Sequence, residues 1–224
     1  MTPKLYDYVL SASCYKVRLL ASLLAVKLDT VAVDFHPGRE HKGRAFRALN
    51  PAGTLPVLVC GELVLTESAA MLMYLARQWG AEGRWAGDET AEGAARVQGW
   101  LAFAARLGGT LGMARLHDVL HTPADIGAVR AEGIMCLREL EAVLTERRFA
   151  GQIFLAADHP TIGDIACFPN VALAPDGGVA LDDYPAIRLW MRAIRSLDRF
   201  VEMPGIHRLH ELRPAPEAGG AGAR

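Results

Sequence analysis

The chain has 224 residues, of which 51% are hydrophobic and 22% charged, and its formal net charge at pH 7 is -1. This composition is typical of a globular protein with one large or two small domains, and the near-zero charge gives no reason to expect a nucleic-acid or membrane partner. No apolar run reaches the roughly 18 residues that could span a membrane, and the N-terminus has no apolar signal-peptide core. The four cysteines show no CxxC spacing. We therefore expect a reduced, cytoplasmic protein.

The first 79 residues mix strand and helix patterns. KLYDYVL predicts a strand, and the apolar positions from Val17 to Leu28 then fall on one face of a helix. TVAVDF predicts a second strand, and PVLVCGELVL predicts two short strands about a tight turn at Gly61. ESAAMLMYLARQW is helical and stops at Gly80. The order β-α-β, loop, β-β-α predicts a sheet that mixes parallel and antiparallel pairs.

The rest of the chain has no convincing strand pattern. Residues 80–88 contain three glycines and are expected to form a linker, and residues 89–212 are expected to form an all-helical domain. One long helix is predicted around Trp100 to Leu111, and two more in AVRAEGIMCLRELEAVL and YPAIRLWMRAIRSL. Thr161 and Asp164 have the spacing of a capping box. The tail, residues 213–224, is rich in proline, alanine and glycine and is expected to be disordered.

A candidate ligand site lies between Leu49 and Leu75. If the Leu55–Pro56 bond is cis, the backbone N–H and C=O of Leu55 point outward and can pair with an extended peptide. Glu67 and Ser68 begin a helix, where N–H groups and the Ser68 hydroxyl favour a carboxylate while Glu67 can hold an ammonium. These groups suit the α-amino-acid end of a small peptide. The alternatives are an ordinary trans edge-strand proline and ordinary helix-start residues.

In combination, NPAGTLPVL, TES, TIGDIACF and YPAIRLWMRAI resemble the glutathione S-transferase superfamily over about residues 4 to 205. The resemblance implies an α+β, thioredoxin-like, glutathione-binding domain over residues 1–79, followed by an all-α helical bundle that binds the acceptor. It also implies a homodimer that presents the thiolate of its co-substrate glutathione to a small hydrophobic electrophile, as in detoxification. No metal is expected, because His117 and His121 in HDVLH have no obvious third ligand.

The resemblance assigns further residues. His41 or Lys42 is expected against the carboxylate at the glycine end of glutathione, although HKGRAFR also fits a solvated basic loop. The residues expected to line the acceptor pocket, which fit a helix core equally well, are Trp100, Phe103, Met113 and Leu116. The glycines of RLGGTLGM either open the mouth of that pocket or permit close packing.

SASCYKVR contains the candidates that act on the glutathione sulfur. A thiol of ordinary pKa, about 8.5, is mostly protonated at neutral pH, so the site needs a donor that favours the thiolate. Ser11 is the first candidate, by its similarity to theta-like members, and Ser13 is the second, by its similarity to zeta-like members. Cys14 is either a covalent site, as in beta- and omega-like members, or a small buried residue. The Tyr6 and Tyr8 hydroxyls are expected in mid-strand rather than at the end of the strand, where they would be poor donors.

Four functions therefore remain open at this stage. The first is a glutathione transferase, and the second is a thiol-disulfide reductase that works through Cys14. The third is a glutathione-dependent isomerase, for which only one of two expected serines precedes Cys14. The fourth is a non-catalytic protein-binding scaffold, against which an intact set of Pro56, Glu67 and Ser68 argues.

Overall fold

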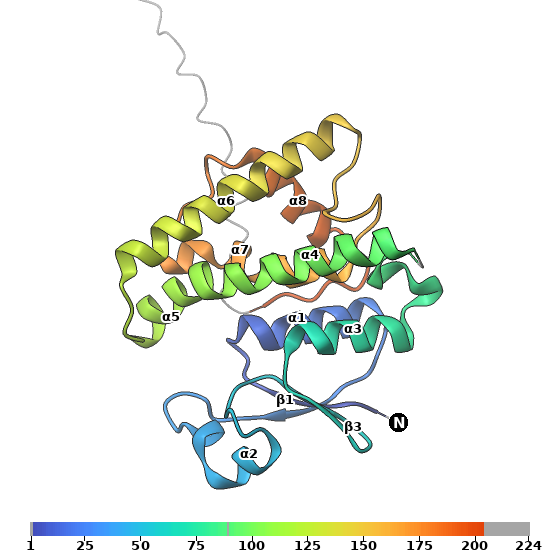
Figure 1. Cartoon of the computed structure of the whole chain (residues 1–224). Helices are drawn as coiled ribbons and strands as arrows, with labels where there is room; N and C mark the ends of the chain where they lie inside the picture. The colour runs from blue at the N-terminus through green and yellow to red at the C-terminus, as the bar shows by residue number, and fades with distance from the viewer. Residues whose placement is uncertain (1, 89, 204–224) are drawn as a thin grey trace, which may run out of the picture.

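The structure is a computed structural model that describes residues 2–88 and 90–203, with only the backbone described at 81–83. An N-terminal α/β part lies below a larger helical part (Figure 1). The predicted tail and residues 204–212 lie outside the described residues. The elements of the α/β part are β1 (Lys4–Asp7), α1 (Ala12–Leu23), β2 (Asp29–Ala32), the 3-10 helix η1 (Glu40–Lys42), α2 (Arg44–Leu49), β3 (Val57–Cys60), β4 (Leu63–Leu65) and α3 (Ser68–Trp79).

The α/β part contains a mixed four-stranded sheet in the order β2-β1-β3-β4. β1 and β2 are parallel, whereas β1–β3 and β3–β4 are antiparallel, which confirms the mixed sheet. The predicted hairpin is also confirmed, with Gly61 at its turn in the left-handed region (φ +63°). Helices α1 and α3 cover one face of the sheet, and α2 covers the other (Figure 1). This is the thioredoxin-like arrangement that the sequence predicts.

Three local features of the α/β part depart from the sequence prediction. Helix α1 ends at Leu23, before the expected Leu28. The expected loop after β2 contains η1 and α2, and α2 buries Phe46 against Val33 and Val57. A helix of six residues with one buried apolar side chain has no periodicity to detect. The first strand ends at Asp7, three residues earlier than predicted, because the chain turns there and the Ser11 N–H donates to the Tyr8 carbonyl oxygen at 2.9 Å.

The helical part begins with a 3-10 helix inside the expected linker. The predicted long helix is interrupted by one turn of π-helix, η3, which coincides with the glycines of the sequence GGTLG. None of the helices in residues 2–88 and 90–203 is long and apolar enough to cross a membrane. The elements of this part are η2 (Ala81–Ala86), α4 (Ala91–Leu107), η3 (Gly108–Gly112), α5 (Met113–Leu120), α6 (Ile126–Phe149), α7 (Ile162–Ala172), η4 (Ala174–Gly177) and α8 (Pro185–Arg195).

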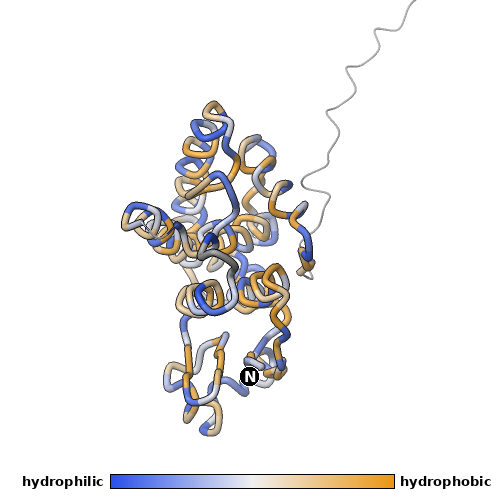
Figure 2. Tube along the Cα trace, turned by 90° about the vertical axis from the view of Figure 1, so that its right-hand side faces the viewer, coloured by the Kyte–Doolittle hydropathy of each residue, from blue (hydrophilic) through white to orange (hydrophobic). Residues whose placement is uncertain are grey.

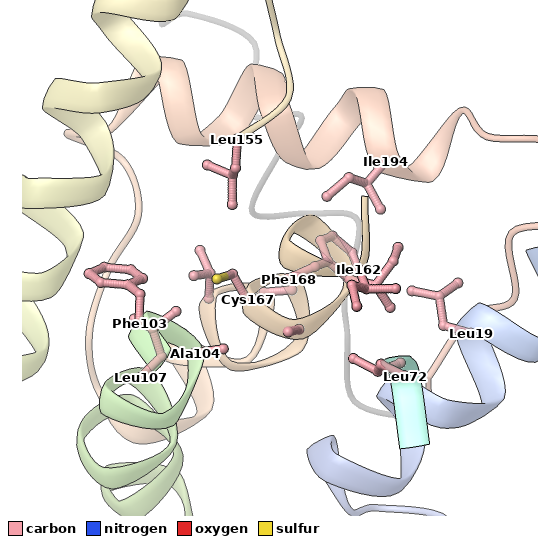
Figure 3. Packing of buried hydrophobic residues seen from close by; sticks show 14 of the residues in the cluster. Leu19, Leu72, Phe103, Ala104, Leu107, Leu155, Ile162, Cys167, Phe168 and Ile194 are labelled. Atoms are coloured by element: carbon pink, nitrogen blue, oxygen red, sulfur yellow. The ribbon is translucent and has the colours of Figure 1, made fainter. Parts of the chain in front are cut away.

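One hydrophobic core joins the two parts. Leu19 of α1 and Leu72 of α3 point toward Ile162 and Phe168 of α7, and all four side chains are fully buried (Figure 3). The helices alternate between hydrophilic and hydrophobic segments, as expected for helices that bury one face (Figure 2). Because α1 packs directly on α7, the relative position of the two parts is fixed by apolar contacts.

The start of α7 contains the predicted capping box. The Thr161 hydroxyl accepts from the Gly163 N–H at 3.2 Å, and an Asp164 oxygen accepts from the Thr161 N–H at 2.9 Å. The same carboxylate also accepts from the Leu155 N–H and from Trp190 Nε1, both at 2.9 Å. Burial raises the pKa of Asp164, and these hydrogen bonds oppose the rise. Asp164 therefore connects α7, α8 and the loop before α7.

Candidate active site

A cavity of about 350 Å³ lies between the α/β part and the helical part. Its α/β wall comes from the segment after β1, from residues near η1, and from the loop before β3. Its opposite wall comes from η3, α5 and α7. The lining residues are Tyr8, Leu10, Ser11, Ala12, Ser13, Phe35, His41, Lys42, Gly53, Thr54, Leu55, Gly108, Gly112, Arg115, Leu116, Val119, Leu120 and Asn170.

Ser11 lies at the N-cap of α1 and faces the cavity. Its Oγ accepts a hydrogen bond from the Cys14 N–H at 3.2 Å. An acceptor role at the cap leaves the hydroxyl hydrogen available to donate to a ligand. The second helical residue, Ser13, also lines the cavity. Both hydroxyls therefore lie at the positive end of the helix dipole, where an anion is stabilised.

Cys14 lies on the same turn but is turned away from the cavity. Its side chain is 0% exposed, and its Sγ accepts from the Tyr8 N–H at 3.5 Å. Burial raises the pKa of the Cys14 thiol to about 12, although the hydrogen bonds of Ser11 and Tyr8 oppose the rise. A buried thiol that stays protonated at neutral pH is a poor nucleophile.

Tyr8 and Phe35 are cavity residues that the sequence reasoning missed. The rings of Tyr8 and Phe35 stack at 5.2 Å, and Phe35 in turn stacks on the His41 ring at 4.1 Å. The expectation that Tyr8 lies in mid-strand is wrong, because β1 ends one residue before it. An alternating apolar and polar run such as KLYDYVL carries no signal for that end.

His41 and Lys42 both line the cavity but differ in exposure. His41 is 5% exposed, and its Nδ1 has no hydrogen-bond partner within the described residues. Burial, together with Lys42 and Arg39, lowers the pKa of His41, so the ring is neutral at pH 7. Lys42 is exposed, and its Nζ donates to the Gly53 carbonyl oxygen at 2.7 Å. His41 thus offers a neutral ring, and Lys42 offers a charge.

The loop before β3 is shaped by Asn50. Its Nδ2 donates to the Thr54 carbonyl oxygen at 2.9 Å, and its Oδ1 accepts from the Ala52 N–H at 3.1 Å. The following Leu55–Pro56 bond is cis, which is the geometry considered from the sequence. Leu55 lines the cavity, and Pro56 is buried beneath it.

Glu67 and Ser68 lie at the start of α3, beside the proline loop. The last residue pair of β3 and β4 is Leu58 with Leu65, and Pro56 and Glu67 each lie two residues beyond that pair on their own strand's side of the hairpin. Glu67 is the exposed N-cap of α3, and its side chain makes no capping hydrogen bond. The structure thus brings these residues to the same end of the hairpin as Leu55, although neither Glu67 nor Ser68 lines the cavity itself.

Only one of the four residues expected in the acceptor pocket lines this cavity, namely Leu116. Trp100 and Phe103 pack edge to face at 5.3 Å, and both belong to the hydrophobic core between α4 and α7. Met113, the first residue of α5, is also absent from the cavity wall. The reason is that α4 turns its apolar face toward α7, so this helix reaches the cavity only at η3, through Gly108 and Gly112.

Arg115 connects the cavity wall to the Ser11 segment. Its Nη1 donates to the Leu10 carbonyl oxygen at 2.8 Å, and its Nε donates to Asp176 Oδ2 at 3.1 Å. Arg115 is 8% exposed, whereas the Asp176 side chain is 25% exposed, so the ion pair is buried on the Arg115 side only. Arg115 holds the chain just before Ser11 against α5, and no sequence pattern marks this role.

The two histidines of HDVLH make separate contacts at the end of α5. His117 Nδ1 lies 2.9 Å from the Thr122 carbonyl oxygen, and His121 is the left-handed C-cap of α5. Within residues 2–88 and 90–203, no three His, Cys, Asp or Glu side chains gather as metal ligands.

Comparison with known proteins places this architecture. Residues 1–77 match the family model described as glutathione S-transferase, N-terminal domain. The chain is 33% identical over 182 residues to glutathione S-transferase 2 of Anopheles gambiae, covering 80% of this chain and 84% of that protein. The chain belongs to the glutathione S-transferase superfamily.

Other members of this superfamily differ in activity. Maleylpyruvate isomerase of Ralstonia sp. is 30% identical, with 88% of this chain and 94% of that protein covered. Among solved structures, a possible glutathione S-transferase from Rhodopseudomonas palustris has a TM-score of 0.81 at 27% identity, covering 91% of this chain and 98% of that one. Membership in the glutathione S-transferase superfamily therefore determines the fold but does not determine which reaction the protein catalyses.

Proposed function

We propose that the protein is a glutathione transferase that stabilises the glutathione thiolate with the Ser11 hydroxyl. The observation that carries the proposal is the position of Ser11 at the N-cap of α1, facing the cavity. Its oxygen accepts from the Cys14 N–H, and its hydrogen remains available to a sulfur anion. Ser13 and Tyr8, which also line the cavity, are the alternative donors.

The other contacts follow the length of glutathione. The ammonium and carboxylate of its γ-glutamyl end are assigned to Glu67 and Ser68 at the start of α3, where N–H groups favour an anion. Its central backbone is assigned to Leu55, next to the cis bond. Its glycine carboxylate is assigned to His41 and Lys42, which line the far side of the cavity. This order is supported by the hairpin register, which brings Glu67 beside the proline loop.

The chemistry needs the thiolate rather than the thiol. Lowering a thiol pKa by about two units requires roughly 2.7 kcal/mol of preferential stabilisation of the anion. One charged hydrogen bond and the end of a helix dipole together supply energy of this order. The sulfur lone pair then forms a bond to the electrophilic carbon of the acceptor, and the leaving group departs with its bonding electrons.

The alternative of a reductase that works through Cys14 is disfavoured by the burial and the raised pKa of that thiol. A glutathione-dependent isomerase is the second candidate, because a relative named maleylpyruvate isomerase is 30% identical over most of both chains. Ser13 precedes Cys14 in this chain, but position 12 is alanine. An isomerase requires the same thiolate, so the role of Ser11 is common to both functions.

Calorimetry with glutathione tests the binding step. Wild-type protein is expected to bind at millimolar ligand or below, and Glu67→Ala is expected to bind at least about tenfold more weakly, because the ammonium loses its charged partner. Glu62→Ala is the matched control, since this exposed acid lies at the opposite end of the same hairpin. If the wild type does not bind glutathione, the transferase and the isomerase both fail, and the scaffold function is left.

We further propose a cytoplasmic homodimer. The proposal rests on superfamily membership and on the general preference of oligomers for closed two-fold symmetry. Light scattering at micromolar protein should give twice the mass of the chain, and a monomer mass would contradict it.

A further inference from the structure

The helical wall of the cavity contains two deeply buried polar side chains. Arg115 of α5 is 8% exposed and Asn170 of α7 is 5% exposed, and both line the cavity. The remaining lining residues of this wall are glycine or apolar: Gly108, Gly112, Leu116, Val119 and Leu120. Two buried polar groups on an otherwise apolar wall are the usual way in which a small-molecule site selects its ligand.

The Asn170 side chain lies next to the glycines of η3. Its side-chain amide makes no hydrogen bond within the described residues, and it lies against the inner side of η3. A Cβ added at Gly112 would lie 3.0 Å from Asn170 Oδ1, and one added at Gly108 would lie 3.8 Å from Nδ2. A buried amide without a protein partner is satisfied by solvent or by ligand, because leaving it unpaired costs free energy.

Arg115 has donor capacity beyond its contacts with the protein. Its bonds to Asp176 and Leu10 use Nε and Nη1, and Nη2 makes no hydrogen bond within the described part of the chain. The formal charges among the lining residues are those of Lys42 and Arg115, and the lining includes no aspartate or glutamate. Asp176 offsets part of the Arg115 charge, but the wall remains suited to an anion and offers it two kinds of N–H donor.

We propose that Arg115 and Asn170 recognise the acceptor, and that this acceptor is a small electrophile bearing a carboxylate. The inference rests on the proposed transferase function and narrows its substrate from a hydrophobic electrophile to an acidic one. The guanidinium and the amide N–H donate to the two carboxylate oxygens, and the apolar residues of α5 pack against the carbon skeleton. Ser11, on the α/β wall of the same cavity, holds the attacking sulfur.

A matched pair of acceptors tests the proposal. Chlorodinitrobenzoate and chlorodinitrobenzamide, each with the chlorine para to the variable group, react at the same carbon: the sulfur bonds to it, and chloride leaves with the bonding pair. For each acceptor, the kcat/KM of the enzyme is divided by the rate constant of its uncatalysed reaction with glutathione. This ratio corrects for the different intrinsic reactivity of the two acceptors. The wild type is expected to favour the benzoate by about tenfold or more, since charged hydrogen bonds are the strong ones.

Three variants locate the preference. Asn170→Asp places a like charge beside the carboxylate and is expected to abolish the preference. Gly112→Ala is expected to reduce it, because the new methyl group displaces the Asn170 amide. Gly109→Ala is the control, since a Cβ at this exposed residue of the same π-turn meets nothing within 4 Å. A preference that survives both Asn170→Asp and Gly112→Ala would refute the role of Asn170.

The failures of the two proposals can be distinguished. Equal corrected rates for the two acceptors would refute the carboxylate subsite and leave the transferase function intact. If neither acceptor reacts, the transferase function fails. The subsite is then tested alone by calorimetry with the benzoate and the benzamide that carry a methyl group in place of chlorine. Each is added to protein saturated with S-methylglutathione. Tighter binding of the acid than of the amide would support the subsite, and equal binding would refute it.

Discussion

Replacing Ser11 with alanine removes two functions of one hydroxyl. The Ser11 Oγ caps α1 by accepting from the Cys14 N–H at 3.2 Å, and in the proposed mechanism its hydrogen is donated to the glutathione sulfur. Loss of a serine cap costs about 1 kcal/mol of folding stability. Loss of a hydrogen bond to a charged sulfur costs roughly 1.5–3 kcal/mol of thiolate stabilisation.

The second loss sets the expected change in pKa. Because one pKa unit corresponds to about 1.36 kcal/mol, the thiol of bound glutathione should titrate roughly one to two units higher in Ser11→Ala than in wild type. The thiolate stabilisation disappears while the thiol form is unaffected, so the shift is upward. The pH dependence of the conjugation rate should move upward by the same amount. Glutathione affinity should change little, because both ends of the peptide are held by other residues.

Ser11→Gly is the control for the cap. Glycine at an N-cap costs only a few tenths of a kcal/mol relative to serine. Ser11 has φ -80° and ψ 120°, an extended conformation that glycine and alanine both adopt. Both variants should therefore raise the thiol pKa equally, whereas only Ser11→Ala should lower the melting temperature appreciably. The assays are the ultraviolet absorbance of the bound thiolate against pH, and thermal unfolding.

Wild-type titration of the bound thiol in both Ser11 variants would show that Ser11 is not the donor. A rise in pKa with Ser13→Ala or with Tyr8→Phe would then identify the donor, since both side chains line the same cavity. If turnover is lost only with Cys14→Ala, the reaction is covalent at that sulfur.

Three further predictions follow from buried or neighbouring groups. Cys14→Ala should leave the conjugation rate and its pH profile unchanged. Iodoacetamide should not label Cys14 at about pH 8 in the folded protein, because burial raises the pKa of this thiol to about 12. Detection of a labelled Cys14 peptide by mass spectrometry would contradict this. Asp164→Ala should lower the free energy of unfolding, measured with denaturant, by at least about 3 kcal/mol, because it leaves several buried donors unpaired, including Trp190 Nε1. The control Asp198→Ala, at an exposed residue, should lower it by less than about 0.5 kcal/mol. In the free protein, burial together with Lys42 and Arg39 lowers the pKa of His41, whereas a bound glycine carboxylate favours the charged ring, so ligand binding is coupled to protonation of His41 as the pH falls. Calorimetry should therefore show S-methylglutathione binding more tightly at about pH 5.5 than at about pH 7.5, and a flat profile for His41→Gln.

The sequence alone determined the features that depend on interactions within a few residues. The β3–β4 hairpin follows from two apolar runs about Gly61, and the start of α7 follows from the spacing of Thr161 and Asp164. Ser11 is placed at the start of α1 by the same kind of local pattern, since an N-cap bonds to N–H groups on the first turn. The mixed sheet and the two-part organisation were also predictable, because strand and helix periodicities differ.

The tertiary structure decided which distant residues meet. Trp100 and Phe103 satisfy the pattern of a pocket and of a core equally well, and only the packing of α4 against α7 assigned them to the core. Tyr8 lies in the cavity because the first strand ends before it, and Arg115 and Asn170 reach the same space from helices more than fifty residues apart. Periodicity reports that a helix has an apolar face but does not report what that face covers. The composition of the acceptor wall is therefore a property of helix packing, which the sequence pattern does not specify.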